Sequence, residues 1–308
     1  MSNVIATYFY QEPDNFDSTY ANIKGDNKNK IYWNTVYLFF ISSCTINKSV
    51  RHCLFTNISK FLHREELERL GVEIYDNVEN SNLTKGKWAS VKFFFDVVNY
   101  ININPIFPND KYYALFDTDC LAINPFNFDL LTDNNYAYIS GKESDTNYNF
   151  HGKSFRNLSL YYKEIEPSVT IDIKNKIGGE FFCFKKVENN IIINQFNKIL
   201  QSNINKELKT EEQILTMINA SLPFSINENH IKRVWTTAKT FNLKKRDLST
   251  FCFLHLPSEK NYLTNKILSN YQKNGYLIDN FQNKTLLNYP FILRIIKILK
   301  TIKQRFKI

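Results

Sequence analysis

Short apolar segments alternate with segments of helical character along the first part of the chain. Residues 4–10, 52–57 and 72–75 are rich in β-branched and aromatic side chains, which predicts three short strands. Residues 60–70 lie between a serine and a glycine, the residue types that commonly begin and end helices, so a helix is predicted there. The resulting order is strand, helix, strand.

The same alternation continues as far as residue 116. Residues 87–100 place apolar side chains at helical spacing, and residues 111–116 (KYYALF) are a further strand candidate. Residues 31–43 are apolar enough for either a helix or a strand. Because alternating strands and helices form sheets that are covered on both faces, the pattern predicts an α/β fold with a mainly parallel central sheet and helices on both faces.

The second half of the chain is less regular. Residues 140–175 are polar, aromatic and typical of loops, whereas residues 177–185 (IGGEFFCFK) and 251–256 have strand character. A helix capped by Thr210 is predicted as far as Asn219. With only 8 Gly and 8 Pro and no internal repeat, the chain offers little material for a linker. Residues 1–283 are therefore expected to form one compact domain.

Composition favours a folded protein in a reducing compartment. Hydrophobic residues make up 43% of the 308-residue chain, which suffices for a large core and excludes global disorder. The five cysteines are scattered without C-x-x-C spacing, which argues against a disulfide framework or a zinc ribbon. The first residues lack the pattern of a secretory signal, and the longest apolar run, residues 36–41, is far too short to cross a bilayer. A cytoplasmic location is expected.

Charge is concentrated at the C-terminal end. Residues 284–308 hold seven basic residues and no acidic one, and subtracting these seven from the formal net charge of +9 leaves +2 for residues 1–283. On a helical wheel the apolar and basic side chains of this segment fall on opposite sides. The segment is therefore predicted to be an amphipathic helix that holds the protein on an anionic membrane surface, at the inner face of the cytoplasmic membrane. The alternative is a helix that packs on the protein body.

Two carboxylates follow the strand at residues 111–116. Asp117 and Asp119 are one residue apart in an Asp-Thr-Asp triplet. Ligands of open parallel sheets bind beyond the carboxyl ends of the strands, and carboxylate oxygens suit Mg²⁺ or Mn²⁺. The triplet therefore predicts a divalent-metal site, with a solvated acidic turn as the alternative.

Three further motifs follow in the second half of the chain. They are Gly178-Gly179-Glu180 at the start of a strand, Thr210-Glu211-Glu212-Gln213 at the start of a helix, and His255 after an apolar strand with Lys260 five residues later. With the Asp-Thr-Asp triplet, this order of features resembles the nucleotide-sugar-dependent glycosyltransferases of the GT-A fold, of the kind that build bacterial surface glycans. The resemblance covers most of residues 1–265 but rests on short motifs.

The resemblance implies a binding site for a metal and a nucleotide-sugar donor. It implies that Asp117, Asp119 and His255 bind Mn²⁺ or Mg²⁺ and that Lys260 completes the diphosphate site. Three further residues are candidates for donor contacts, each with a structural alternative. Lys92 resembles a basic position near the diphosphate but could be a solvated lysine, and Tyr8 could stack on a uracil or pack in the core. Gly179 could admit a sugar closely, or the two glycines could form a bulge.

Candidates for acceptor chemistry are the carboxylates Glu211, Glu212 and Glu180. A carboxylate can deprotonate an acceptor hydroxyl or stabilise an oxocarbenium-like centre. Glu211 and Glu212 also suit the first turn of a helix for electrostatic reasons alone, because Thr210 is a plausible N-cap. At least one of the two is expected to have only that role.

The expected function is a metal-dependent hexosyltransferase. It would transfer a sugar from a nucleotide diphosphate donor, expected to be a UDP-sugar, to a glycan or glycolipid acceptor such as a lipopolysaccharide or capsule precursor. A nucleotidyltransferase or a metal phosphatase could use the same Asp pair. A non-enzymatic alternative is a basic protein that binds membrane surfaces or nucleic acid. Because residues 1–283 are nearly neutral, no nucleic-acid partner is expected.

Overall fold

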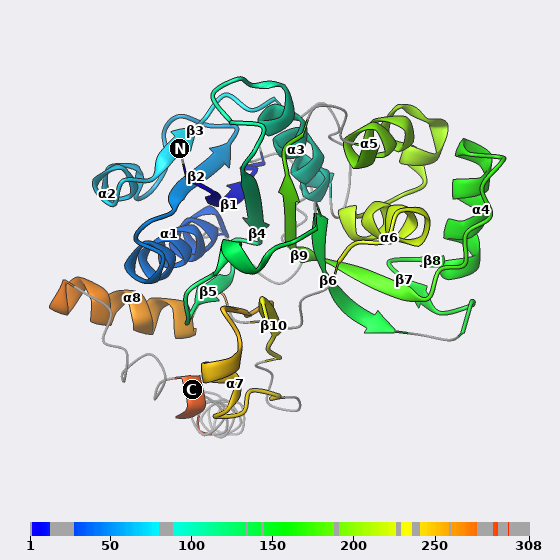
Figure 1. The fold of residues 1–308 in the computed structure, drawn as a ribbon. Coiled ribbons are helices and arrows are strands. Elements are labelled where there is room, and N and C mark those ends of the chain that lie inside the picture. The colour runs from blue at the N-terminus through cyan, green and yellow to red at the C-terminus, as the bar shows by residue number, and fades with distance from the viewer. Residues whose placement is uncertain are drawn as a thin grey trace, which may run out of the picture.

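A six-stranded sheet forms the centre of the protein (Figure 1). The structure is a computed structural model that describes residues 2–12, 28–79, 89–133, 135–142, 145–187, 191–225, 229–235, 241–258, 260, 262–275, 286–288 and 295. In spatial order the strands are β3 (Glu73–Tyr75), β2 (Arg51–Thr56), β1 (Val4–Phe9), β4 (Tyr112–Phe116), β9 (Asn175–Lys185) and β6 (Asn135–Lys142). The strands predicted before residue 116 are all present.

The sheet is mixed but mostly parallel. Strands β3, β2, β1 and β4 pair in parallel, whereas β9 pairs antiparallel with both β4 and β6. The chain leaves β1 for β2 and β3 on one side, and β4 lies on the other side of β1. At such a reversal of strand order the connections diverge and leave a crevice at the carboxyl ends of the strands. In this sheet the crevice lies beyond β1 and β4.

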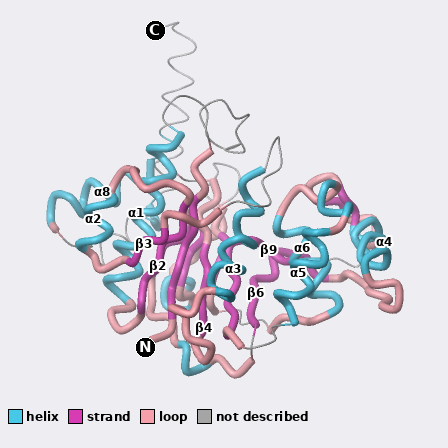
Figure 2. Tube along the Cα trace, turned by 90° about the horizontal axis from the view of Figure 1, so that it is seen from above, coloured by secondary structure: helices cyan, strands magenta, loops and turns pink. Residues whose placement is uncertain are grey.

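Helices cover both faces of the sheet, as predicted (Figure 2). Helices α1 (Lys28–Ile46) and α8 (Tyr262–Asn274) pack on one face, while α3 (Phe93–Ile103), α5 (Ile191–Gln201) and α6 (Glu211–Ser221) pack on the other. Successive side chains of β1 point to opposite faces of the sheet and so contribute to the hydrophobic cores on both faces. Ile5 packs in the core on the α1 side, whereas Val4 and Ala6 pack in the core on the α3 side. The α/β prediction is confirmed at this level.

The remaining elements are short or peripheral. Residues 31–43, for which the sequence allowed either a helix or a strand, belong to the 19-residue helix α1. The helix predicted over residues 60–70 is confined to α2 (Arg64–Arg69). Helix α4 (Phe155–Ile165) lies in the region of residues 140–175 that was predicted to be loop. The other short elements are the strands β7 (Asn149–Phe150) and β8 (Lys153–Ser154), the helix α7 (Asp247–Thr250) and the 3₁₀ turns η1 (Ala89–Lys92), η2 (Phe128–Leu130) and η3 (Asn203–Lys206).

A second, three-stranded sheet connects the end of the domain to the crevice. Its strands are β10 (Ile231–Arg233), β11 (Phe253–His255) and β5 (Cys120–Ala122), and β5 begins directly after the Asp-Thr-Asp triplet. Strand β11 pairs antiparallel with β5, so that His255 lies opposite Cys120. This pairing brings His255 close to the Asp-Thr-Asp triplet at residues 117–119.

The basic segment predicted to begin at residue 284 lies almost entirely outside the described residues. Leu286 is 1% exposed and packs in the core on the α1 side of the sheet, whereas Ile295 is exposed. At least one residue of the segment thus belongs to the packed body of the protein. None of the helices in the described residues combines the length and apolarity needed to cross a membrane.

Candidate active site

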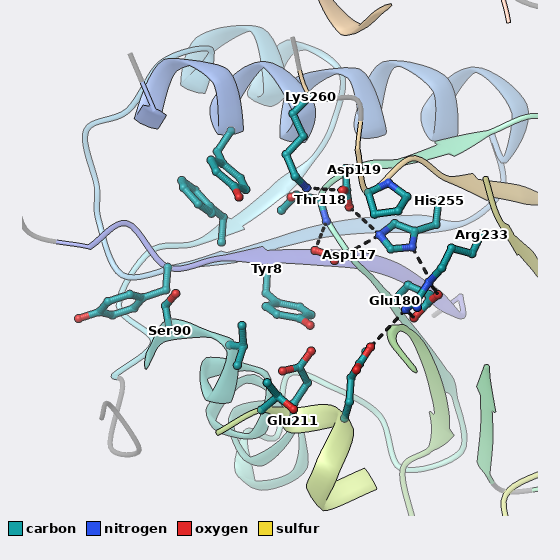
Figure 3. Close-up of a pocket in the computed structure, with 18 of the residues that line it drawn as sticks. Tyr8, Ser90, Asp117, Thr118, Asp119, Glu180, Glu211, Arg233, His255 and Lys260 are labelled. Atoms are coloured by element: carbon teal, nitrogen blue, oxygen red, sulfur yellow. Dashed lines mark hydrogen bonds and ion pairs between the residues drawn. The ribbon is translucent and has the colours of Figure 1, made fainter. Parts of the chain in front are cut away.

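A pocket of about 240 Å³ opens at the carboxyl ends of β1 and β4, where the strand order reverses. Figure 3 shows a lining rich in ionisable side chains from both sheets and from the start of α6. Those side chains are Asp117, Asp119, His151, Glu180, Glu211, Glu212, Arg233, His255 and Lys260, beside Tyr8, Tyr10 and Tyr32.

Backbone hydrogen bonds fix the Asp-Thr-Asp triplet at the end of β4. The Asp117 N–H donates to the carbonyl of Glu180 on β9 (3.1 Å), and the Cys120 N–H donates to the Asp117 carbonyl (3.2 Å), which closes a tight turn. The Leu256 N–H donates to the Asp119 carbonyl (3.0 Å). The triplet is thus tied to both sheets.

Asp117, Asp119 and His255 form a group that fits a divalent metal. Each offers one ligand atom within 4.8 Å of the others. His255 Nε2 lies 3.1 Å from Asp119 Oδ1 and 3.6 Å from Asp117 Oδ2. The side chain of Asp119 is 1% exposed, and its buried Oδ1 has His255 Nε2 as a close neighbour but no hydrogen bond of regular geometry within the described part of the chain. Two carboxylates and an imidazole suit Mn²⁺ or Mg²⁺, and a bound cation would coordinate this buried oxygen.

Lys260 supplies a positive charge beside this group. Its Nζ forms an ion pair with Asp119 Oδ2 and lies 5.1 Å from the ring centre of Tyr32. Burial alone would lower the pKa of Lys260, but the charge of Asp119 raises it above its ordinary value. Burial likewise acts to raise the pKa of Asp119, and the charges of Lys260 and His255 instead lower it. Both groups are therefore ionised at neutral pH.

The carboxyl group of Glu211 lies at the start of α6, across the pocket from the metal group (Figure 3). Its Oε2 is buried and has no hydrogen-bond partner among the described residues. Burial, followed by repulsion from Glu212, raises the pKa of Glu211 well above 4.5. The raised pKa favours the protonated form of this side chain and distinguishes it, as a candidate for proton transfer, from the ion-paired carboxylates of the pocket.

The conformation of Glu211 depends on the glycine at position 179. A Cβ atom added to Gly179 would lie 2.0 Å from Glu211 Oε1, so the space that glycine provides is filled by the glutamate. The sequence left two interpretations of this glycine open, close approach of a donor sugar or a bulge, and in the structure Glu211 occupies the space beside it. The pairing of β9 with β6 is also irregular here, since Ala137 pairs with Phe182 and Tyr138 pairs with Gly178. The bulge considered as the alternative is therefore present.

Glu212 and Glu180 are held by cationic partners. Glu212 contacts His151 Nε2 (2.8 Å), Lys176 Nζ (3.1 Å) and Arg233 (3.2 Å). Burial opposes ionisation of Glu212, but its contacts with His151 and the two cations lower its pKa. Glu180 accepts two hydrogen bonds of 2.6 Å from Arg233, and its pKa is lowered because Arg233 and His255 outweigh its burial. Neither group is suited to take up a proton at neutral pH.

Nine of the ten residues singled out by sequence line the pocket, and Lys92 does not. Lys92 is fully buried, and its Nζ donates to the backbone carbonyl and Oδ1 of Asn205, both at 2.7 Å. Burial lowers its pKa to about 8. The prediction that Lys92 lies beside a diphosphate is corrected, because its ammonium group instead joins η1 to η3. Tyr8 lines the pocket and also packs in the core against Phe94, with 5.7 Å between the ring centres, while its stacking on a uracil stays a prediction.

Four further residues line the pocket although no signal in the sequence predicted them: Arg233, His151, Tyr32 and Trp235. Arg233 ends the three-residue strand β10, and His151 lies between the two-residue strands β7 and β8. Neither residue belongs to a motif, and elements this short leave no periodic pattern in the sequence. The position of Arg233 one strand away from His255 becomes visible only through the pairing of β10 with β11.

A scan of protein-family models and a search of curated proteins find no match to this chain. The geometry of the pocket is therefore the basis for the functional proposal.

Proposed function

We propose that this chain is a metal-dependent glycosyltransferase that transfers a sugar from a nucleotide diphosphate donor, a UDP-sugar in the first instance, to a hydroxyl group of a surface-glycan acceptor. The observation that carries the proposal is the group formed by Asp117, Asp119 and His255 at the strand-order reversal, opposite the carboxyl group of Glu211, whose Oε2 has no hydrogen-bond partner among the described residues. Ligand sites of open α/β sheets lie at this position. The GT-A resemblance stated above remains part of the same proposal.

On the donor side, Asp117, Asp119 and His255 would hold Mn²⁺ or Mg²⁺. The ion would offset the charge that develops on the departing diphosphate. The Lys260 ammonium group, paired with Asp119 at the same place, adds a second positive charge toward the diphosphate. Tyr8, at the end of β1, provides an aromatic wall for the nucleoside.

On the acceptor side, Glu211 would accept the proton of the attacking hydroxyl. In the overall step the bond between the anomeric carbon and the diphosphate oxygen breaks, a bond to the acceptor oxygen forms, and the nucleoside diphosphate leaves. A base is most effective when its pKa lies near the working pH, and burial raises the pKa of Glu211 in that direction. Glu212 and Glu180 are ion-paired and are excluded from this role.

Product analysis tests the proposal. The protein is incubated with a panel of UDP-sugars and Mn²⁺, and UDP, pyrophosphate and phosphate are measured. UDP release that disappears in Asp119→Asn is the expected result. The matched control is Asp172→Asn, which changes an exposed aspartate that forms an ion pair with Lys174. In parallel incubations, pyrophosphate release from a nucleoside triphosphate supplied with a sugar 1-phosphate would identify a nucleotidyltransferase, and phosphate release from simple monoesters would identify a phosphatase. Either result, or UDP release that persists in Asp119→Asn, contradicts the proposal.

A further inference from the structure

The imidazole of His255 lies between two sets of carboxylates. Its Nε2 faces Asp119 and Asp117, at 3.1 and 3.6 Å, whereas its Nδ1 faces Glu180 Oε1 at 3.4 Å (Figure 3). A neutral imidazole carries a proton on one nitrogen and binds a metal through the other. The nitrogen that keeps the proton is set by the acceptor it faces.

The carboxylate of Glu180 is held in one position by contacts on both of its oxygens. Its carboxylate is fully buried and accepts hydrogen bonds of 2.6 Å on each oxygen from Arg233. A Cβ atom at Gly178 would lie 2.0 Å from Glu180 Oε2, so a glycine is needed where the carboxylate passes. The bidentate contact and this close packing leave the carboxylate one position, beside Nδ1 of His255.

The main chain of Glu180 contacts the other part of the metal group. Its carbonyl accepts the N–H of Asp117 at 3.1 Å. One residue of β9 therefore contacts both segments that supply the candidate metal ligands: Asp117 through its backbone and His255 through its side chain.

We infer that Glu180, held in place by Arg233, is a positioning residue for His255: it keeps the proton on Nδ1 and directs Nε2 toward the metal. The inference rests on the proposed function, because it assumes the metal site formed with Asp117 and Asp119. It moves Glu180 from the acceptor side, where sequence analysis placed it, to the metal side. A carboxylate that orients a metal-bound histidine typically contributes 10- to 100-fold to metal affinity.

The test is a double-mutant cycle on Mn²⁺ binding, measured by titration calorimetry without donor or acceptor. Glu180→Gln is expected to weaken binding by about 10- to 100-fold. In a His255→Ala background the same substitution is expected to have no further effect, because Glu180 acts through His255. The matched control is Glu212→Gln, which removes another carboxylate partner of Arg233 that has no contact with His255.

A second measurement avoids any change at Glu180. The ¹⁵N shifts of the His255 ring are recorded in the wild-type protein with Mg²⁺, and the signals are assigned by their loss in His255→Ala. A proton on Nδ1 is expected, and a proton on Nε2 overturns the inference even if Glu180→Gln fails to fold.

The outcomes separate the inference from the proposed function. If Asp119→Asn and His255→Ala weaken Mn²⁺ binding but Glu180→Gln does not, the metal site stands and the inference fails. The inference also fails, and the metal site also stands, if Glu180→Gln and Glu212→Gln weaken Mn²⁺ binding equally. The conclusion is the same if the effects of Glu180→Gln and His255→Ala on Mn²⁺ binding simply add. If the wild-type protein binds no Mn²⁺, the metal site and the inference both fail.

Discussion

Replacing Gly179 by alanine should disable the acceptor side of the pocket while leaving the fold intact. The new Cβ would lie 2.0 Å from Glu211 Oε1 and 2.9 Å from its Cδ. Neither atom can stay in place. The backbone of Gly179 does not lie in the left-handed region, so alanine can adopt its conformation without strain.

The size of the effect follows from the overlap. Carbon atoms of this kind approach other atoms no closer than 3.0 Å, so the Glu211 carboxylate must move by about 1 Å or more. A displacement of about 1 Å at a reacting group can lower the rate about 100-fold. The carboxylate is the end of a flexible side chain that can rotate away, so we expect the free energy of unfolding to change by less than about 1 kcal/mol.

The assay compares kcat for sugar transfer with the unfolding midpoint in urea. Gly179→Ala is expected to lower kcat about 100-fold at unchanged Mn²⁺ affinity, and to have little additional effect in a Glu211→Gln background. Gly141→Ala on neighbouring β6 is the matched control, because its Cβ would make an ordinary contact of 3.9 Å with Lys176. Near-normal kcat in Gly179→Ala would refute the assignment of Glu211, and loss of folding would refute the claim that the side chain can rotate away.

Three further predictions concern the metal side, the pH dependence and the C-terminal end. Asp119→Ala should abolish Mn²⁺ binding, and it should lower the free energy of unfolding by about 3–5 kcal/mol because the buried Lys260 loses its ion-pair partner. Calorimetry measures the Mn²⁺ binding and urea unfolding measures the stability; unchanged stability would contradict the buried ion pair. Glu211→Gln should raise the melting temperature more at pH 8 than at pH 4. As the pH rises above 4.5, an unfolded glutamate loses its proton before folded Glu211 does, so rising pH destabilises the wild type; equal shifts at both pH values contradict this sign. Removing residues 289–308 should leave donor turnover intact and reduce sedimentation with anionic vesicles, whereas removal from residue 285 also takes Leu286 from the core, at a cost of about 1.5–3 kcal/mol. Unchanged sedimentation would contradict the membrane prediction.

The candidate metal ligands could be located from the sequence because strand ends are local features. Asp117 follows a strand of apolar residues, and His255 ends another, so each residue could be located at an edge of a sheet. The environment of Asp119 was not predictable in the same way. The alternative of a solvated acidic turn is excluded for its side chain, which is 1% exposed because the pairing of β11 with β5 covers it.

Other elements lacked a readable local signal. Helix α1 is buried along an unbroken run of residues, so it shows no apolar stripe that would distinguish it from a strand. Helix α4 buries only Phe155, Leu158 and Tyr162 within a polar region, and its start depends on a capping box between Ser154 and Asn157. Its pattern was hidden among polar and aromatic residues.

Strand β9 shows why the two halves of the pocket depend on each other. Its pairing with β6 skips the residues between Gly178 and Phe182, and such bulges re-aim side chains beside active sites. Within that stretch, Gly179 makes room for Glu211 on α6, and Glu180 contacts Asp117 and His255. If β9 paired regularly with β6, consecutive side chains would point to opposite faces of the sheet, and the positions of Gly179 and Glu180 would change together. The Gly-Gly-Glu sequence therefore couples the candidate metal ligands to the candidate base through a single rigid strand.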